Sequence, residues 1–411
     1  MQPVIIKGRA SLSNPVSRFQ AYSRESNPDW AWPAQARDAP RIGPGLRVAR
    51  PASPTVRPVA PPTQPAESAR PAEGAESARP AESANSAEAA GFDEPPRLRT
   101  TVTAETARSI ISRNTSPDIP FEQSVNAYRG CEHGCIYCYA RPSHAYLDLS
   151  PGLDFETQLF AKENAPQVLR RELSRTGYVP KLIAMGTNTD PYQPIEKRLR
   201  ITAGLLDVFD EFNHPVSITT KSSLITRDLA ALSRLARRNL VRVQLSIGTL
   251  DRELARRMEP RACTPTARLD TLRTLKDAGI PVSVIIAPVI PGLTDYELER
   301  VAIAASQAGA SEASYVLLRL PREVATLFQE WLQAHYPMKA AHVMNLLRAM
   351  RAGKNYESEF SQRMKGSGPY ADMLRQRFKR ICARTGLNVR PIELDCTSFR
   401  NPEHAAQLDL F

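Results

Sequence analysis

The stretch RGCEHGCIYC, residues 129–138, brings three thiols close together in the sequence. Cys131, Cys135 and Cys138 have the spacing C-x3-C-x2-C and make up half of the six cysteines of the chain. Thiolates bind soft metals and iron–sulfur clusters. The glycines at positions 130 and 134 indicate a loop, and a loop lets three thiolates face one centre. We therefore expect these cysteines to hold an iron–sulfur cluster.

The number of cysteines in this loop bears on the kind of site. Three protein ligands on a [4Fe–4S] cube leave one iron free to bind another molecule. A structural zinc site takes four ligands, and His133, the nearest candidate, would strain a tetrahedral site because it lies between two of the cysteines. We expect the other cysteines, Cys263, Cys382 and Cys396, to be inert thiols.

The sequence CEHGCIYC resembles the C-x3-C-x-aromatic-C signature of the radical S-adenosylmethionine (SAM) superfamily. The resemblance implies a [4Fe–4S] cluster whose open iron binds the amino and carboxylate groups of SAM. In that family the cluster donates an electron, the sulfonium C–S bond breaks, and a 5′-deoxyadenosyl radical abstracts a hydrogen atom from the substrate. Such cofactors carry the chemistry, while the protein positions them and excludes water. The resemblance also implies a reductant such as flavodoxin or ferredoxin, and it places Tyr137 near the adenine.

Residues 100–320 further resemble spore photoproduct lyase, a DNA-repair enzyme, and more closely an uncharacterised bacterial group of lyase-like proteins with the sequence TDPYQPIE. This resemblance implies SAM contacts from polar residues at strand ends: Thr187, Asn188 and Asp190 for the amino group, Lys221 for the carboxylate, and Ser246 for the ribose or carboxylate. Glu259 and Arg268 are similar to a lyase pattern EP…R and are implied to support the site.

One departure from the lyase pattern concerns the substrate radical. The lyase has a cysteine at the second strand end that returns a hydrogen atom to the product radical. This chain has Met185 and Gly186 in that region, and Cys263 is the nearest other cysteine. Thymine-dimer reversal is therefore not carried over by the resemblance, and the hydrogen donor stays open.

The elements that must position these residues follow from the hydrophobic pattern. Short β-branched runs alternate with amphipathic stretches, and the runs are 181–187, 215–222, 240–248, 280–288 and 312–320. With a strand near 124–129 that enters the cysteine loop, the pattern predicts about six βα units and a parallel sheet. Six units are fewer than the eight of a closed barrel. We predict an α/β fold with a partial (β/α)6 TIM-like barrel and catalytic residues at the carboxyl ends of its strands.

The regions on either side of this core differ from it in composition. Residues 1–95 hold 15 of the 35 prolines and a near-repeat of Pro, Ala, Glu and Ser, so we predict a disordered region there. Its first thirty residues are a candidate arm that docks on the domain. The predicted organisation continues with a radical SAM core at 100–321, a helical C-terminal extension at 322–400 and a flexible tail at 401–411.

The charge of the chain suggests a polyanionic partner. Of the formal +11, residues 1–95 contribute 11 basic and 10 acidic residues, which leaves 43 basic and 33 acidic residues, a net +10, for the rest. DNA is the expected partner, and a solvated arginine-rich surface is the alternative. The last five residues, QLDLF, resemble the peptide with which bacterial repair proteins bind the replication sliding clamp, with Gln407, Leu408, Leu410 and Phe411 as contacts. A tail that folds back on its own domain is the alternative.

Together these features predict a radical SAM enzyme that acts on a nucleic-acid lesion. Two alternatives stay open: modification of a protein or small molecule by the same chemistry, and an iron–sulfur electron-transfer or sensor module. No apolar run approaches the roughly 20 residues that span a bilayer. The N-terminus lacks the apolar core of a secretory signal. We therefore expect a cytoplasmic protein without a membrane partner.

Overall fold

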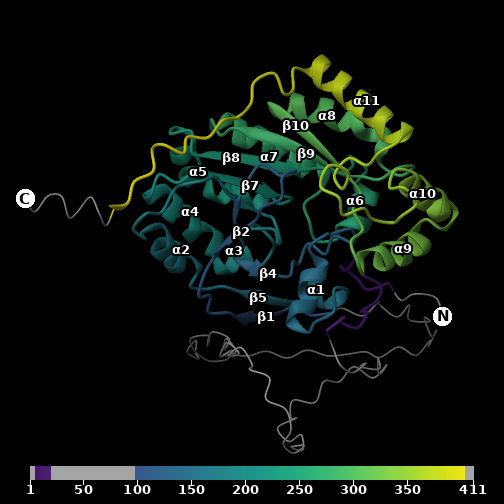
Figure 1. Cartoon of the computed structure of the whole chain (residues 1–411), viewed down its shortest axis with the longest axis horizontal. Coiled ribbons are helices and arrows are strands. Elements are labelled where there is room, and N and C mark those ends of the chain that lie inside the picture. Colours follow the sequence, from purple (N-terminus) through teal and green to yellow (C-terminus); the bar gives the residue numbers. More distant parts are fainter. Residues whose placement is uncertain (1–4, 20–97, 403–411) are drawn as a thin grey trace, which may run out of the picture.

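The computed structural model describes residues 5–19 and 98–402, and its centre is a curved seven-stranded sheet in the order β10-β9-β8-β7-β6-β3-β2 (Figure 1). Consecutive neighbours from β3 to β10 pair in parallel. These six strands are β3 (Gln123–Val125), β6 (Ile183–Met185), β7 (Val216–Thr220), β8 (Val241–Ser246), β9 (Val282–Val289) and β10 (Glu312–Leu317). At the edge, β2 (Ile111–Arg113) pairs antiparallel with β3. The predicted partial barrel is confirmed.

Helices connect the parallel strands and cover the outer face of the sheet (Figure 1). They are α2 (Ala165–Leu173), α3 (Glu196–Leu199), α4 (Ile201–Glu211), α5 (Leu229–Ala236), α6 (Arg252–Met258), α7 (Pro265–Asp277) and α8 (Leu298–Gln307). The helical segment between β6 and β7 is broken at Arg200, which has the left-handed φ of 55°. The carboxylate of Glu196 accepts the N–H of Thr202 at 3.0 Å, so it satisfies a free donor at the start of α4.

The inner face of the sheet carries many polar side chains. Apolar residues of the strands point outward to the helices and are buried, whereas inward positions alternate with them and are partly exposed. These inward positions include Ser217, Thr219, Arg242, Gln244 and Ser314. Arg242 Nε donates to Ser217 Oγ at 3.1 Å. A closed eight-stranded barrel fills its interior with branched apolar side chains. The interior of this open barrel instead has many polar side chains.

A small second sheet lies below the first in Figure 1, and the sequence did not predict it. It has the order β1 (Thr101–Ala104), β5 (Gln158–Ala161), β4 (Tyr128–Arg129), with β1 and β5 parallel. The 3₁₀ helix η1 (Arg141–Leu147) and α1 (Leu153–Thr157) lie between β4 and β5 in the chain. This sheet carries the cysteine loop, because that loop follows β4 directly.

Residues 5–19 form the predicted arm. The arm lies beside α1 and α9 (Val324–His335): Ser13 Oγ donates to Glu330 Oε2 at 2.5 Å, and Asn14 Nδ2 donates to Asp154 Oδ1 at 3.0 Å (Figure 1). For residues 5–19 this corrects the prediction of disorder over 1–95, because backbone and side-chain donors of the arm meet buried acceptors. Residues 20–97 lie outside the described residues.

The C-terminal extension is helical, with α9, α10 (Pro337–Ala349) and α11 (Pro369–Thr385). Helix α11 packs beside α8 on the outside of the barrel (Figure 1). The connection 350–368 returns to the sheet, because Leu317 N donates to Met364 O at 2.8 Å. The clamp-like residues Gln407, Leu408, Leu410 and Phe411 lie outside the described residues. Within the described ranges no helix has the length and apolar character needed to cross a bilayer.

Candidate active site

The cysteine loop lies between β4 and η1 and is held by backbone hydrogen bonds to two helices. Cys131 N donates to Phe155 O of α1 at 2.9 Å, and Ile136 N donates to Met258 O of α6 at 3.0 Å. Cys131 and Cys135 are buried, each 7% exposed, while Cys138 is partly exposed. The structure thus brings the three predicted metal ligands together on one well-supported loop.

A buried arginine organises the backbone of this loop. Arg141 is fully buried and donates to Cys135 O at 2.9 Å and to Gly134 O at 3.1 Å. Its guanidinium also pairs with the buried carboxylate of Glu156 at 2.5 Å. Sequence reasoning missed both residues, because nothing in their local sequence separates them from the many other charged residues of the chain.

Asp190, at the carboxyl end of β6, links three parts of the site. Its Oδ1 accepts the hydroxyl of Thr220 at 2.6 Å, and its Oδ2 accepts the backbone N–H of Lys221 at 2.8 Å and lies 3.3 Å from His133 Nδ1. Burial opposes ionisation of Asp190, but His133, Thr220 and the N–H of Lys221 outweigh it and lower its pKa to about 2. Both carboxylate oxygens are therefore engaged by protein groups, and its contact with SAM stays a prediction.

Thr187 and Asn188 lie beside the residue that follows Cys138. The Asn126 side chain, just after β3, donates to Thr187 Oγ1 and accepts the N–H of Asn188, both at 3.0 Å. The hydroxyl of Tyr139 donates to Thr187 O at 2.5 Å. Both predicted SAM contacts are partly exposed at the carboxyl end of the sheet. Asn126 was missed, because it is far from both in sequence.

A buried ionic network lies on the other side of the cysteine loop. Glu259 pairs with Arg268 and accepts the hydroxyl of Tyr137, and Arg268 Nη1 donates to Ser246 O at 2.8 Å. Burial opposes ionisation of Glu259, but Arg268 and Lys221 outweigh it and lower its pKa. The network connects the cysteine loop with the ends of β7 and β8.

Lys221 and Ser246 complete the predicted set. Lys221 Nζ lies 5.9 Å from the centre of the Tyr137 ring. Burial opposes protonation of Lys221, but Cys135 and Glu259 outweigh it and raise its pKa. Ser246 is 3% exposed, and its Oγ donates to Ala287 O at 3.3 Å. Its hydroxyl therefore has a protein partner, and its contact with SAM stays a prediction.

The donor set fits an iron–sulfur cluster. Burial raises the pKa of Cys135 to about 12, although Lys221 and Arg268 act against it, and burial and Asp190 raise that of Cys131. Such thiols become thiolates when a metal binds them. No three His, Cys, Asp or Glu side chains in residues 5–19 and 98–402 meet as a single-ion site would require. A [4Fe–4S] cube takes each thiolate on a separate iron, and the three free thiols of this loop supply the number and kind of ligand that it needs.

The strand end after Met185 has no room for a side chain. Gly186 has a φ of 91°, and a Cβ there would overlap with the carbonyl oxygen of Thr219 on β7. Position 186 therefore cannot hold the cysteine that the lyase carries in this region. The Cys263 thiol accepts the N–H of Ser223 at 3.1 Å, three residues beyond the end of β7.

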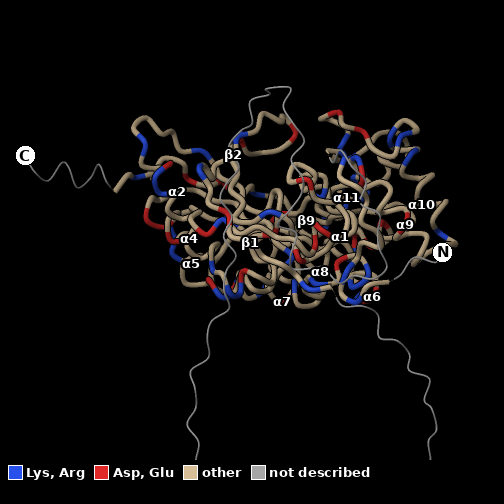
Figure 2. Tube along the Cα trace, turned by 90° about the horizontal axis from the view of Figure 1, so that it is seen from below, with Lys and Arg blue, Asp and Glu red and all other residues tan. Residues whose placement is uncertain are grey.

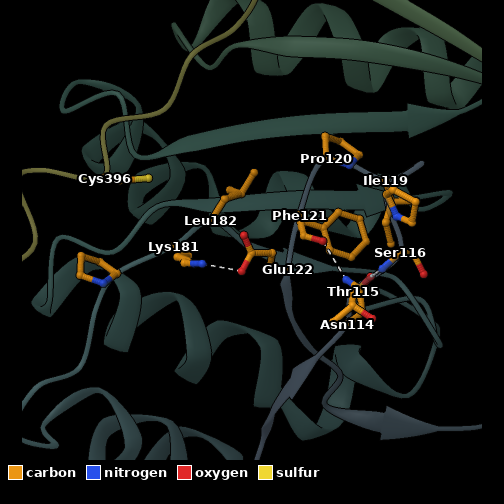
Figure 3. Close-up of a pocket in the computed structure, with 12 residues that line it drawn as sticks. Asn114, Thr115, Ser116, Ile119, Pro120, Phe121, Glu122, Lys181, Leu182 and Cys396 are labelled. Atoms are coloured by element: carbon orange, nitrogen blue, oxygen red, sulfur yellow. Dashed lines mark hydrogen bonds and ion pairs between the residues drawn. The ribbon is translucent and has the colours of Figure 1, made fainter.

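A pocket of about 670 Å³ lies at the opposite end of the barrel (Figure 3). It is lined by the segments that enter β3 and β6, including Glu122 and Lys181, which pair at 2.5 Å, and by Cys396. Chemistry in parallel barrels takes place at the carboxyl ends of the strands. This pocket is therefore separate from the candidate active site.

Comparison with known proteins agrees with this site. Residues 125–304 match the model of the radical SAM superfamily. An uncharacterized protein of Mycobacterium bovis is 39% identical over 232 residues, which are 56% of this chain and 68% of that protein. An uncharacterized protein of Methanocaldococcus jannaschii is 31% identical over 173 residues, 42% of this chain and 62% of that protein.

A solved structure, spore photoproduct lyase complexed with dinucleoside spore photoproduct, aligns with a TM-score of 0.47 and 14% identity over 70% of this chain and 80% of that one. The superfamily that the cysteine motif resembles is confirmed by the family model. The chain belongs to the radical SAM superfamily and is an enzyme whose cofactors are a [4Fe–4S] cluster and SAM.

Proposed function

We propose that this enzyme acts on a nucleic acid, with a damaged DNA base as its substrate. The observation that carries the proposal is the set of polar, partly exposed side chains on the inner face of the sheet, among them Ser217, Arg242 and Gln244. A nucleobase presents donors and acceptors on its edges, and such a lining can meet them.

The protein residues of the site hold and orient the cofactors. When bound, the cluster and SAM supply the radical that removes a hydrogen atom from the substrate. Cys131, Cys135 and Cys138 hold the cluster, and Arg141 fixes their loop through the carbonyl oxygen of Cys135. Lys221 offsets the negative charge of the thiolates, since it lies next to Cys135.

The contacts with SAM are part of this proposal. Thr187 and Asn188 would hold the amino group, and Lys221 would hold the carboxylate. Tyr137, fixed by its hydrogen bond to Glu259, would hold the adenine. Asp190 acts mainly by positioning other groups of the site, because its oxygens hold His133 and the start of the loop after β7.

The charge of the chain supports a polyanionic substrate. The net +10 lies outside residues 1–95, and lysine and arginine residues are spread over the whole described trace (Figure 2). A positive field of this kind raises the rate of encounter with DNA and makes binding depend on salt.

Hydrogen transfer tests the proposal directly. The holoenzyme is incubated without oxygen with SAM, a reductant such as flavodoxin, and DNA that carries deuterium at base lesions. We expect deuterium in the released 5′-deoxyadenosine. Cys135→Ala should give neither the cluster absorbance nor the product.

Release of 5′-deoxyadenosine without deuterium, from every lesion offered at each labelled position, would contradict a nucleic-acid substrate. It would favour a protein or small molecule as the substrate of the same enzyme. No 5′-deoxyadenosine at all from an intact cluster would instead favour an electron-transfer module.

A further inference from the structure

Two arginines at the carboxyl end of β10 lack carboxylate partners. Arg319 follows β10 by two residues, and Arg351 follows α10 in the connection 350–368. Neither forms an ion pair with an acidic residue in the described part of the chain. Their neighbour Arg363 differs, because Asp118 binds it through two hydrogen bonds of 2.5 and 2.6 Å.

Several donors of these two guanidinium groups have no acceptor in the described part of the chain. Arg351 is 1% exposed, and among the described residues it donates through Nη2 alone, to Leu318 O at 2.8 Å and Arg363 O at 3.2 Å. Its Nε and Nη1, and the Nε of Arg319, are buried without a partner in the described residues. The acidic group Glu357 acts to raise the pKa of Arg351, but its carboxylate pairs with Lys354 at 3.1 Å.

Such an arrangement is costly without a further acceptor. Buried charged donors are nearly always hydrogen-bonded, and two guanidinium groups at close range repel each other. Burial and the charge of Arg319 lower the pKa of Arg351 to about 10. An anion placed between these groups would supply the missing acceptor and remove the repulsion.

Arg319 lies directly beside the active site. The guanidinium carbon of Arg319 is 4.9 Å from the centre of the Tyr139 ring, and Tyr139 follows the cluster ligand Cys138. Arg319 Nη2 also donates to the hydroxyl of Tyr356 at 3.3 Å. Tyr139 exposes 46% of its surface, and Phe360, whose ring lies against the guanidinium of Arg363, exposes 45%. Aromatic rings and arginine planes of this kind stack on bases.

We propose that Arg319 and Arg351 bind a backbone phosphate of the nucleic-acid substrate and so place the adjoining base at the cluster. This inference rests on the proposed function. The fork of a guanidinium matches two phosphate oxygens. The exposed rings of Tyr139 and Phe360 fit a nucleotide with its base unstacked from the strand, which is how a base becomes accessible to an enzyme.

DNA binding by the full-length holoenzyme tests this assignment. The probe is a short fluorescein-labelled single-stranded oligodeoxynucleotide, titrated by anisotropy without oxygen at several salt concentrations. Arg319→Gln should weaken binding by about tenfold or more, because a charge-assisted hydrogen bond is lost. The slope of log affinity against log salt should fall by about one. Arg351→Lys, which keeps the charge but loses the fork, should also weaken binding.

Arg273→Gln is the matched control. It removes one positive charge at an exposed site on α7, where Arg273 pairs with Asp270. We expect little change in affinity. Equal affinities for Arg319→Gln and Arg273→Gln, with tight binding by the wild type, would overturn the phosphate site and leave the proposed function intact.

Two other outcomes would also overturn the inference. Loss of SAM binding by Arg319→Gln with unchanged DNA affinity would assign this arginine to the cofactor. Displacement of the probe by an acidic peptide as readily as by unlabelled oligonucleotide would show that the site reads carboxylates, and a protein substrate would then be favoured. Failure of the wild type to bind any oligonucleotide at low salt would refute the inference and the proposed function together.

Discussion

Asp190 couples the electrostatics of the site to its geometry. Its carboxylate is buried, yet it remains ionised because His133 and three hydrogen-bond donors surround it. A carboxyl whose pKa is lowered in the folded state adds stability above its unfolded pKa, and this stability is lost as the pH falls through the folded pKa. For Asp190 the relevant range is from the ordinary value of 3.8 down to about 2.

We predict that Asp190→Asn removes this part of the acid sensitivity. The shift from 3.8 to about 2 corresponds to about 2 kcal/mol of unfolding free energy near neutral pH. Thermal unfolding of the apoprotein, followed from neutral to acid pH, should show a smaller decline for the variant. Asp270→Asn, at an exposed ion pair on α7, should keep the wild-type decline. If the unfolding temperatures of Asp190→Asn and the wild type fall in parallel with pH, the role assigned to Asp190 is wrong.

Gly186 allows the close approach of β6 and β7 at the site. Both a positive φ of 91° and the contact with Thr219 exclude a side chain there. Gly177 has a similar φ of 77°, but nothing lies within 4 Å of the place where its Cβ would be. Substitutions at the two glycines therefore distinguish the energetic cost of backbone strain from that of steric overlap.

We predict that Gly177→Ala lowers the free energy of unfolding by about 1 kcal/mol, the cost of a left-handed conformation. Gly186→Ala should cost clearly more, about 3 kcal/mol or above, because the strands must also move apart. Denaturant unfolding of both variants measures the difference. An equal loss in both would mean that the strand ends can separate freely.

At the scale of elements, strands were predictable where they are long and buried. The runs at 280–288 and 312–320 appear as β9 and β10 with small changes at their ends. β4 has only two residues, Tyr128–Arg129, and no hydrophobic pattern can identify so short a strand. The small sheet was therefore missed, since its strands gain their pairing from the tertiary fold.

The residues of the site also differ in whether the sequence could predict them. The cysteines could be found because a cluster ligand set is local in sequence. Arg141 and Glu156 could not, since their roles depend on contacts with backbone atoms brought together by folding. The arm is a further example, because residues 9–11 meet Glu156 across about 146 positions of sequence.

The arm completes the support of the cysteine loop. Arg9 is 5% exposed and donates to Glu156 O at 2.6 Å, Leu98 O at 3.0 Å and Thr100 Oγ1 at 2.9 Å. The N–H groups of Ala10 and Ser11 donate to the Glu156 carboxylate at 3.3 and 3.0 Å. Glu156 in turn holds Arg141, and Arg141 holds the loop.

We predict that Arg9→Ala lowers the unfolding free energy by about 3 kcal/mol, because several charge-assisted hydrogen bonds are lost in a buried place. The iron content of the reconstituted protein should fall with it. Arg18→Ala is the matched control within the arm, since the ion pair of Arg18 with Glu323 is partly exposed and should contribute less than about 1 kcal/mol. If both variants keep full stability and iron content, the arm does not support the loop.

At the scale of the whole molecule, the C-terminal segment leaves the barrel on the side away from the cluster. Phe399 packs 5.5 Å from the ring of Tyr178 and 5.8 Å from that of His214, just before β7. Arg400 N donates to Phe212 O at 3.0 Å. The amino ends of the strands therefore anchor the chain before its tail, while the active site lies at their carboxyl ends.

We propose that the tail recruits the enzyme to the sliding clamp, and this placement predicts that recruitment and chemistry are separable. A variant without residues 407–411 should fail to recover purified clamp in a pull-down. Its rate of 5′-deoxyadenosine release should match that of the wild type, because the anchor at Phe399 stays in place. Leu408→Ala with Phe411→Ala should behave like the deletion if these apolar side chains fill a groove. Unchanged recovery of the clamp by both variants would rule out the tail as its ligand. A fall in 5′-deoxyadenosine release with the deletion would show that the tail acts at the site itself.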